Sequence, residues 1–281
     1  MAVVLDGKEV ARKIRQNLKE EVSKLKEEGI SPKLAVIMVG DDSASKIYVR
    51  NKSIACNEIG IEYEEYLLSE ETTMKELLSL IDKLNNDKTI NGILLQSPIP
   101  KNLDINEAFK AIDPIKDVDG FNPMNVGKLC LGQDAFISCT PYGVIKILED
   151  YNIEIEGKNA VIIGRSNIVG KPMLQCLLNK NATVTVCHSR TKNLAEITKM
   201  ADILVVAIGK SKFVTKDMVK DGAVVVDVGI NRGEDGKLCG DVDFEGVSKV
   251  ASYITPVPGG VGPMTIAMLM NNIVKATKLQ N

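Results

Sequence analysis

The sequence predicts an α/β protein of two domains, each built on a parallel β-sheet that is covered by helices. Two separate alternations of apolar runs and amphipathic segments support this prediction, one ending near residue 95 and one starting near residue 151. The apolar runs are continuous, as in strands buried on both faces of a sheet. The 281 residues also exceed one typical domain of about 100–200 residues. We expect a cleft between the two domains.

The first alternation opens with a helix predicted from Asp6 to about Glu28, with Asp6 as the capping residue. The elements that follow alternate strand and helix, at residues 34–40, 43–60, 61–68, 74–84 and 90–95. The second alternation begins near Tyr151, and its strands and helices are predicted at residues 160–164, 172–178, 183–186, 194–199, 203–208 and 224–228. The second sheet is of the type that binds dinucleotides.

The domain boundary is predicted near Thr140-Pro141, because proline disfavours helix at the residue before it. The first domain would then span residues 1–139, and the second, Rossmann-like domain residues 140–263. A final helix, residues 264–281, lies beyond the second sheet. We expect it to return to the first domain and complete it.

Composition excludes several classes of function. The 35 Lys and Arg residues nearly balance the 37 Asp and Glu residues, and no basic run suggests a nucleic-acid partner. The six cysteines are scattered without a C-x-x-C pair, which is typical of reduced thiols rather than of disulfides or a zinc site. No signal peptide and no membrane-spanning run is recognisable. We therefore expect a cytoplasmic protein with no metal and no membrane partner.

The segment 258–265 has the most unusual composition, with three glycines and two prolines. We expect it to lie outside helices and strands, because glycine permits positive φ and proline removes a donor. A helix is predicted from Thr265 to Leu279, with Pro263 just before it. A rigid loop that leads into a helix N-terminus suits an anion or a flat ligand. A turn that only joins two domains is an equally open interpretation.

Three polar residues of the first domain are candidates for a site. Tyr48 and Lys52 are spaced i, i+4 on the helix that follows the first strand, so they share a face. Gln96 directly follows an apolar strand, at the edge that faces the ligand crevice in open α/β sheets. By spacing alone, an exposed lysine beside a half-buried tyrosine is the commoner situation. Gln96 is equally compatible with a polar residue at the start of a loop.

Asp117 and Asp119 precede Gly120 and Phe121 in a predicted turn. As a metal site this pair is incomplete, because no Glu or His follows at ligand spacing. A carboxylate that accepts hydrogen bonds from the N–H groups of a heterocycle is the better functional interpretation.

The second domain contains an altered dinucleotide loop, Gly164 to Gly170. Ser166 stands where the usual G-x-G-x-x-G pattern has its middle glycine, but an apolar strand precedes the loop and Pro172 opens a helix after it. A plain strand–helix turn is the alternative. No acidic residue follows at 187–191, where NAD-binding domains hold the ribose with a carboxylate.

The absence of that carboxylate favours NADP. Arg165 and Ser189, with Arg190 as a further candidate, would bind its 2′-phosphate. Ile230, at the end of another strand, is expected to line the nicotinamide pocket, although strand-end packing would explain it equally. Thr140 is expected to touch the cofactor or to act as a simple hinge. His188 is the only histidine, and we assign it a structural role.

Five motifs together resemble the bifunctional methylenetetrahydrofolate dehydrogenase/methenyltetrahydrofolate cyclohydrolase family in order and approximate spacing. They are residues 48–52, 92–98, 116–120, 164–170 and 258–265. The resemblance spans almost the whole chain, and the last motif is the most specific. One departure is Ser97, where the family usually has an apolar residue between Gln and Pro. This change concerns local packing under the pterin rather than the chemistry.

The resemblance implies a role for each candidate of the first domain. Lys52 would be the central catalytic residue and Gln96 would orient it, while Tyr48 positions or stacks on the substrate and Asp119 holds the pterin ring. The cofactor-binding residues would be those named above, together with the loop residues Gly164 and Ser166. The segment 258–265 would line the cleft, with three residues against the folate: Gly260, Gly262 and Pro263. A homodimer is also implied.

The implied reactions are the NADP⁺-dependent oxidation of 5,10-methylenetetrahydrofolate to the 5,10-methenyl form and its hydrolysis to 10-formyltetrahydrofolate. Because the methenyl intermediate is a cation, a neutral Lys52 is the useful form. Burial and the approaching cation both favour it. Three alternatives remain open at this point: a monofunctional dehydrogenase or cyclohydrolase, a shikimate-dehydrogenase-like enzyme, and a non-enzymatic nucleotide sensor or scaffold.

Overall fold

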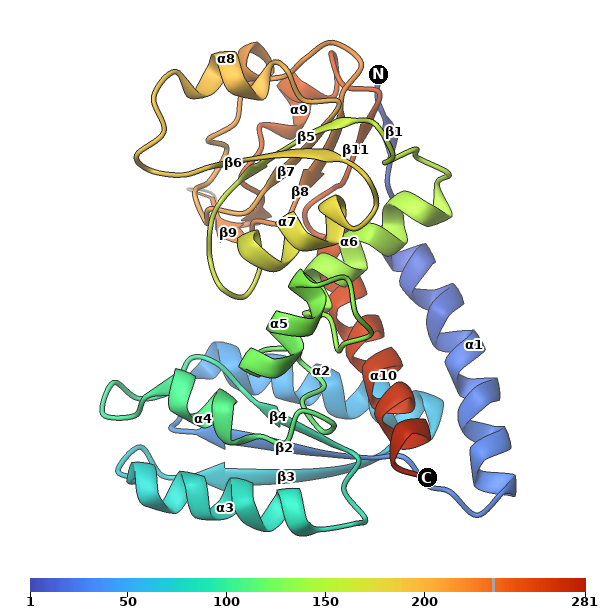
Figure 1. Cartoon of the computed structure of the whole chain (residues 1–281). Coiled ribbons are helices and arrows are strands. Elements are labelled where there is room, and N and C mark those ends of the chain that lie inside the picture. Colours follow the sequence, from blue (N-terminus) through green and yellow to red (C-terminus); the bar gives the residue numbers. More distant parts are fainter. Residues whose placement is uncertain (234–235) are drawn as a thin grey trace. The chain divides into compact units, whose positions relative to one another are not determined.

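The computed structural model describes residues 1–233 and 236–281, which divide into two compact units (Figure 1). Unit 1 contains residues 1–12 and 138–265, and unit 2 contains residues 13–137 and 266–281. Two long helices contribute residues to both units: α1 (Gly7–Glu27) and α10 (Val261–Gln280). Among the residues that the structure describes, no helix combines the length and apolar character needed to cross a membrane.

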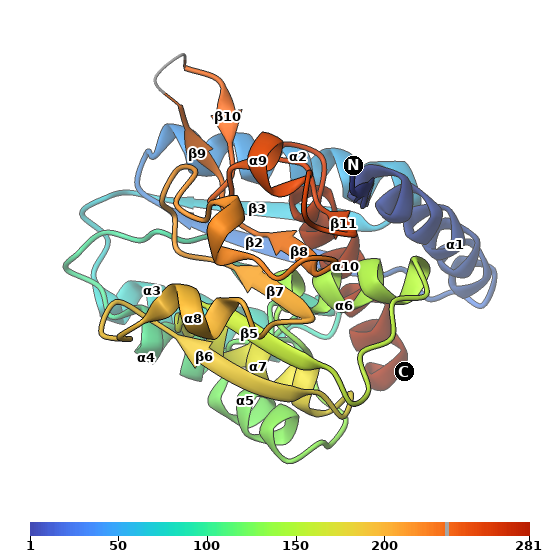
Figure 2. The same cartoon turned by 90° about the horizontal axis from the view of Figure 1, so that it is seen from above.

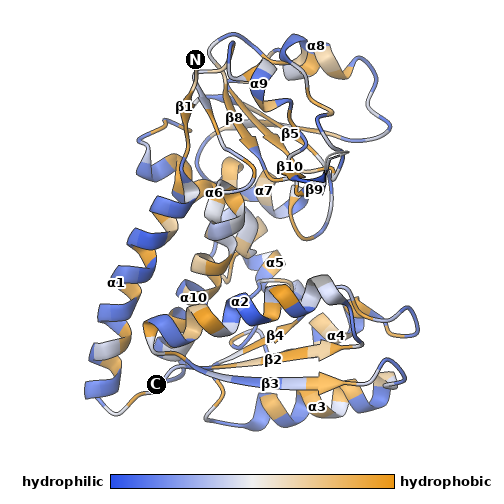
Figure 3. Ribbon diagram, turned by 180° about the vertical axis from the view of Figure 1, so that it is seen from behind, coloured by the Kyte–Doolittle hydropathy of each residue, from blue (hydrophilic) through white to orange (hydrophobic). Residues whose placement is uncertain are grey.

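Unit 2 is built on a three-stranded parallel sheet in the order β3–β2–β4. Its elements are β2 (Lys33–Val39), α2 (Ser43–Ile59), β3 (Glu62–Leu68), α3 (Met74–Asn86), β4 (Gly92–Leu95), α4 (Ile105–Ala111) and α5 (Pro123–Cys130). The central strand β2 is apolar and buried from Leu34 onward, and Figure 3 shows it in the hydrophobic colour. The predicted β–α–β–α–β order is confirmed.

Local capping sets the helix boundaries of unit 2. Asp42 accepts a hydrogen bond from the Ser45 N–H at the start of α2, and Gly60 ends that helix with a φ of +87°. Thr73 and Glu76 form a reciprocal capping box at the start of α3. The apolar face of α3 is buried in the core of the unit through three residues: Leu77, Ile81 and Leu84.

A buried lysine closes the other end of α3. The Lys116 Nζ donates to three backbone carbonyls: Leu84 at 3.0 Å, Asn85 at 2.8 Å and Asp87 at 2.7 Å. The last carbonyls of a helix have no partner within the helix, so this ammonium satisfies groups that would otherwise be buried unpaired. The contact also fixes residue 116 at the start of the segment that carries Asp119.

Unit 1 is built on a six-stranded parallel sheet in the order β1–β11–β8–β7–β5–β6, and Figure 2 shows its strands from β11 to β6 from above. Its strands are β1 (Val3–Val4), β5 (Asn159–Ile163), β6 (Thr183–Cys187), β7 (Ile203–Val206), β8 (Val224–Asp227) and β11 (Tyr253–Ile254). Its helices are α6 (Cys139–Asp150), α7 (Gly170–Leu178), α8 (Leu194–Thr198), the 3₁₀ turn η1 (Lys216–Met218) and α9 (Phe244–Val247). Two short strands, β9 (Asn231–Arg232) and β10 (Leu238–Cys239), pair antiparallel.

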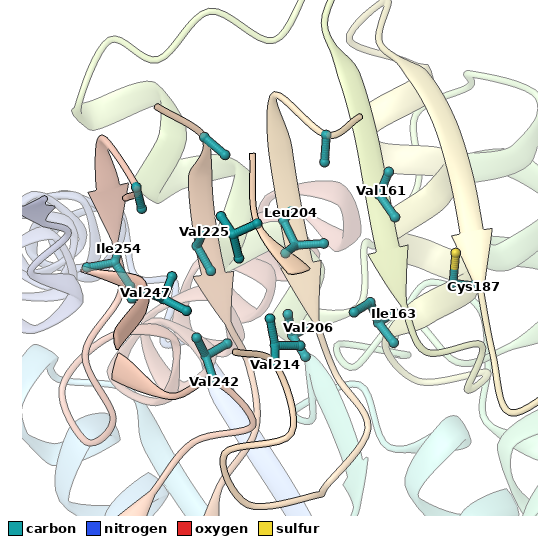
Figure 4. Close-up of a cluster of buried hydrophobic side chains, with 14 residues drawn as sticks. Val161, Ile163, Cys187, Leu204, Val206, Val214, Val225, Val242, Val247 and Ile254 are labelled. Carbon is teal, nitrogen blue, oxygen red and sulfur yellow. The ribbon is translucent and has the colours of Figure 1, made fainter. Parts of the chain in front are cut away.

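The core of unit 1 lies against this sheet. Side chains from β5, β7, β8 and β11 meet there, with Val161, Leu204, Val225 and Ile254 all buried (Figure 4). The apolar runs that the sequence offers at these positions therefore become strands covered by helices, as predicted.

The predicted domain boundaries differ from these units at the N-terminus. We assigned residues 1–139 to the first domain, but Val3 and Val4 pair in parallel with Tyr253 and Ile254 of the unit 1 sheet. The physical reason is the backbone hydrogen bonding of β1, which places residues 1–12 with unit 1. Residues 266–281 share a unit with residues 13–137.

The prediction for the segment 258–265 is wrong at one point. Helix α10 begins at Val261, so Gly262 and Pro263 lie inside its first turn rather than before it. The first four N–H groups of a helix have no intrahelical acceptor, so a proline at this position removes no hydrogen bond.

Replacing the buried lysine tests its capping role. We expect Lys116→Met to lower the free energy of unfolding by about 1–3 kcal/mol, because it leaves buried carbonyls of α3 without a donor. The measurement is urea unfolding followed by circular dichroism. The exposed Lys88, which follows the same helix, gives the control variant Lys88→Met. A Lys116→Met variant as stable as this control would contradict the capping role.

Candidate active site

The first candidate site lies where β2 and β4 end. These neighbouring strands are followed by α2 and by Gln96, whose N–H donates to the Ile37 carbonyl and continues the ladder. The Lys52 Nζ on α2 donates to the Gln96 Oε1 at 2.8 Å. The Gln96 Nε2 donates to the Ser97 carbonyl at 2.6 Å. Because a carbonyl accepts only, this second bond fixes the amide orientation and presents its oxygen to the lysine.

Residues one turn away on α2 define the surroundings of Lys52. Tyr48 is 45% exposed, so its ring is accessible from solvent. Cys56 is buried, and its thiol lies 3.6 Å from the Met270 sulfur. Burial raises the pKa of Cys56 to about 12, although the charge of Lys52 opposes the rise. Cys56 therefore stays a neutral thiol at physiological pH and is no nucleophile.

The two aspartates of the predicted turn differ sharply. Asp117 is buried and accepts from the Phe121 N–H at 3.1 Å, the Asn122 N–H at 2.8 Å and the Asn125 Nδ2 at 2.8 Å. Its carboxylate is thus occupied by its own loop. Asp119 is only partly buried and is the carboxylate of the pair that retains solvent-accessible surface.

Helix α10 supports the same loop. The Asn272 Nδ2 donates to the Val118 carbonyl at 2.8 Å and to the Ile137 carbonyl at 3.1 Å. Sequence reasoning missed this residue, and it also missed the anchoring role of Asp117. The sequence shows only an asparagine within an apolar helix. It does not reveal that this side chain binds the Val118 and Ile137 carbonyls.

The second candidate site is a cavity of about 460 Å³ in unit 1. It lies at the carboxyl ends of β5, β6 and β7, and among its lining residues are Gly164, Arg165, His188, Ser189 and Lys210. The strand β5 has β6 on one side and β7 on the other. Such a switch point is where open α/β sheets bind ligands.

Close backbone approach explains the glycines of this loop. Gly164 has a φ of +130°, and a Cβ there would lie 2.3 Å from the Ala207 carbonyl oxygen. A Cβ at Gly170 would lie 2.3 Å from the Gly164 carbonyl oxygen. Position 166 does not require glycine. The Ser166 Oγ accepts hydrogen bonds from the Val169 and Gly170 N–H groups at 3.1 and 3.4 Å. These bonds hold the loop that leads into α7.

The predicted phosphate-binding residues lie together. Arg165 and Ser189 both line the cavity and are exposed. His188 also lines it, but its Nδ1 accepts from the Arg190 N–H at 3.1 Å. This bond agrees with the structural role that we assigned to His188, since it holds the loop after β6.

A smaller hollow of about 150 Å³ in unit 1 is lined by four further predicted site residues. Ile230, Gly260, Gly262 and Pro263 all line it. Ile230 is 49% exposed, so its side chain is available for a ligand. These residues therefore share a unit with Arg165 and Ser189, whereas the four catalytic candidates of the sequence analysis lie in unit 2.

Helices α1 and α6 hold the loop beside this hollow. The Lys8 N–H donates to the Gly259 carbonyl, and a Cβ at Gly7 would lie 1.8 Å from the Gly260 carbonyl oxygen. The Thr140 hydroxyl lies 3.3 Å from the Thr265 hydroxyl. Thr140 thus contacts the glycine-rich segment directly. Within residues 1–233 and 236–281, His, Cys, Asp and Glu side chains nowhere gather in groups of three that could hold a metal ion.

Comparison with known proteins assigns the chain to a family. Residues 5–119 match the tetrahydrofolate dehydrogenase/cyclohydrolase catalytic domain, and residues 138–281 match the NAD(P)-binding domain of the same family. The chain belongs to the tetrahydrofolate dehydrogenase/cyclohydrolase family. The resemblance seen in the five sequence motifs is confirmed.

Two relatives match almost the whole chain. The bifunctional protein FolD of Halalkalibacterium halodurans is 59% identical over 277 residues, which cover 99% of each chain. The FolD protein of Campylobacter concisus is 60% identical over 275 residues, covering 98% of this chain and 97% of that protein.

Solved structures agree with the fold. The bifunctional FolD of Campylobacter jejuni matches with a TM-score of 0.99 at 54% identity over all of both chains. The Trypanosoma brucei enzyme, solved with NADP cofactor and an inhibitor, matches with a TM-score of 0.94 at 38% identity, covering 99% of this chain and 98% of that one. Shikimate dehydrogenase from Aquifex aeolicus matches at only 15% identity with a TM-score of 0.52, over 89% of this chain and 92% of that one, so it shares the fold alone.

The anchoring carboxylate makes a pH-dependent contribution to stability. Burial raises the pKa of Asp117 to about 6, three hydrogen bonds oppose the rise, and the charge of Asp119 adds to it. The folded chain therefore binds a proton at Asp117 more tightly than the unfolded chain, where aspartate has a pKa of about 3.9. As the pH falls through about 6, this group stabilises the folded state by up to about 1.4 kcal/mol per pH unit.

Asp117→Asn removes this titration. We expect the difference in unfolding free energy, wild type minus variant, to grow as the pH is lowered from about 7 to about 5. Denaturant unfolding at each pH measures it, with Asp82→Asn on the exposed face of α3 as control. A difference that stays constant or shrinks would contradict the raised pKa.

Proposed function

We propose that the chain is a bifunctional enzyme of one-carbon folate metabolism. It oxidises 5,10-methylenetetrahydrofolate to 5,10-methenyltetrahydrofolate with NADP⁺ and hydrolyses the product to 10-formyltetrahydrofolate. The observation that carries the proposal is the Lys52–Gln96 hydrogen bond at the carboxyl edge of the unit 2 sheet, in a chain of this family. Relatives named as bifunctional FolD proteins support both activities in one chain.

The residues of unit 1 fit a dinucleotide. Bound NADP⁺ would supply the hydride acceptor. Gly164 and Gly170 let this loop pack closely against the neighbouring backbone as it leads into α7, whose N-terminus would bind the pyrophosphate. Arg165 and Ser189 line the 460 Å³ cavity and would hold the 2′-phosphate of the adenosine half. Ile230 and the hollow beside it would receive the nicotinamide half.

Lys52 would act as a neutral base. Gln96 is an uncharged acceptor that orients its amine. A neutral Lys52 that donates one N–H to Gln96 keeps its lone pair for a water molecule. This amine would take a proton from water as the oxygen attacks the methenyl carbon, and ring opening would return a proton to the departing ring nitrogen.

The other residues of unit 2 would hold the folate. The exposed ring of Tyr48 lies one turn from Lys52 and would position or stack on the substrate. Asp119, on the loop anchored by Asp117, would accept hydrogen bonds from pterin N–H groups. Unit 2 would then supply these folate contacts and unit 1 the dinucleotide contacts, while Gly260, Gly262 and Pro263 of unit 1 stay predicted contacts of the folate.

The assembly and location of the chain complete the proposal. Family resemblance supports a homodimer and a cytoplasmic enzyme. The six free thiols also suit a reducing compartment.

The role of Lys52 as general base predicts a loss of cyclohydrolase activity when its amine is removed. We expect Lys52→Met to lower cyclohydrolase turnover by about 10²–10⁴-fold, because the general base is removed. The absorbance decay of methenyltetrahydrofolate, corrected for the uncatalysed rate, measures it. Lys46→Met on the same helix, which removes an ion pair to Asp41, is the control. Hydrolysis that continues unimpaired in Lys52→Met would rule out the role.

Cofactor selection tests the second site. We expect the wild type to use NADP⁺ better than NAD⁺, by about 10–100-fold in kcat/KM, because charged hydrogen bonds to the 2′-phosphate are lost with NAD⁺. Ser189→Asp should reverse much of this preference by repelling that phosphate, and Ser189→Ala should fall between the two. Initial rates of reduced cofactor formation measure all three proteins. Equal kcat/KM for both cofactors in the wild type would show the assignment of Arg165 and Ser189 to be wrong.

A further inference from the structure

One buried carboxylate in unit 1 gathers four N–H donors. The Asp241 side chain accepts from the backbone of Ile208 at 2.7 Å, Gly209 at 3.0 Å and Lys210 at 2.8 Å, and from the Asn231 Nδ2 at 2.8 Å. Asp241 is completely buried. A charge so removed from water persists only when its acceptor positions are satisfied, and here both oxygens receive two donors each.

A second buried aspartate holds the first in place. Asp227, at the end of β8, accepts from the backbone N–H groups of Asp241 at 3.0 Å and Val242 at 2.9 Å. A Cβ at Gly240 would lie 1.8 Å from the Asp227 Oδ2, and one at Gly229 would lie 2.2 Å from the Asp241 Cγ. The backbone thus closes around both carboxylates, and neither glycine can carry a side chain without displacing them.

The groups that Asp241 holds belong to both hollows of unit 1. Ile208 and Lys210 line the 460 Å³ cavity that we assign to the adenosine half. Asn231 directly follows Ile230, which lines the smaller hollow that we assign to the nicotinamide half. Asp241 itself lies beneath these surfaces. One side chain therefore ties the segment after β7 to the segment after β8.

We propose that Asp241 is a positioning residue for the dinucleotide, fixing the walls of both hollows at once through the 208–210 backbone and through Asn231. This inference rests on the proposed binding of NADP⁺ to unit 1. Asp241 does not touch the ligand. It sets the spacing between the adenosine and nicotinamide ends of the site before the ligand arrives.

Asp241 has two arms, one toward the 208–210 backbone and one toward Asn231. Two variants separate them. Asp241→Asn keeps the side-chain volume but turns one acceptor into a donor that faces N–H groups, so it disturbs both arms. Asn231→Ala removes only the arm toward Ile230. The control is Asp202→Asn, whose carboxylate also binds a backbone N–H and a lysine, but at the amino ends of β5 and β7.

The probes are NADP⁺ and adenosine 2′,5′-bisphosphate, which carries the adenosine half alone. Titration calorimetry gives their dissociation constants. We expect Asp241→Asn to weaken both probes by about tenfold or more, and Asn231→Ala to weaken NADP⁺ while leaving the bisphosphate within about twofold. Amide hydrogen exchange of the ligand-free proteins should show faster exchange at residues 208–210 in Asp241→Asn only.

The outcomes distinguish the positioning role from the proposed function. A wild-type chain that fails to bind NADP⁺ would overturn the proposed function. A folded Asp241→Asn that binds both probes as the wild type does would overturn the positioning role alone. If Asp241→Asn does not fold, Asn231→Ala decides: unchanged affinity for NADP⁺ overturns the proposal, and selective loss of NADP⁺ affinity supports it.

Discussion

Every strand pair in the two large sheets is parallel, so each sheet has one edge at which all of its strands end. The candidate residues of each unit gather at that edge, because the segments that leave parallel strands emerge side by side. In unit 2 this places Gln96 next to Lys52. In unit 1 it places the loops after β5, β6 and β7 around one cavity. The parallel pairing of the strands thus fixes the edge of the sheet at which these residues lie.

Loops at such an edge have no ladder of their own, and buried charged groups replace it here. In unit 1, Asp227 and Asp241 each accept hydrogen bonds from three or more polar groups, and those of Asp241 come from the segments after β7 and β8. Their partners are mostly backbone atoms, so each holds the course of the chain rather than one side chain. Removing a partner from such a buried group leaves a polar atom unpaired and is costly, which suits segments that must keep their shape when a ligand binds.

Sequence patterns predicted most of the architecture because the buried strands form continuous apolar runs and the amphipathic helices have a helical period. They could not predict β1 and β11, since two residues are too few to form a recognisable run. Asp117 and Asp119 are the same residue type two positions apart, and only the contacts of Asp117 with Asn122 and Asn125 show which one is an anchor. Asp241 belongs to no motif that the sequence analysis found, and its partners at residues 208–210 are more than 30 positions away in the sequence.

The division of the chain into units has a consequence for its synthesis on the ribosome. Strand β1 pairs with β11, whose residues the ribosome makes much later. Unit 2 likewise lacks residues 266–281 until these residues have been made. Neither unit can therefore reach its final form until both of its sequence segments have left the ribosome, and the apolar surface that the late segment covers stays exposed until then.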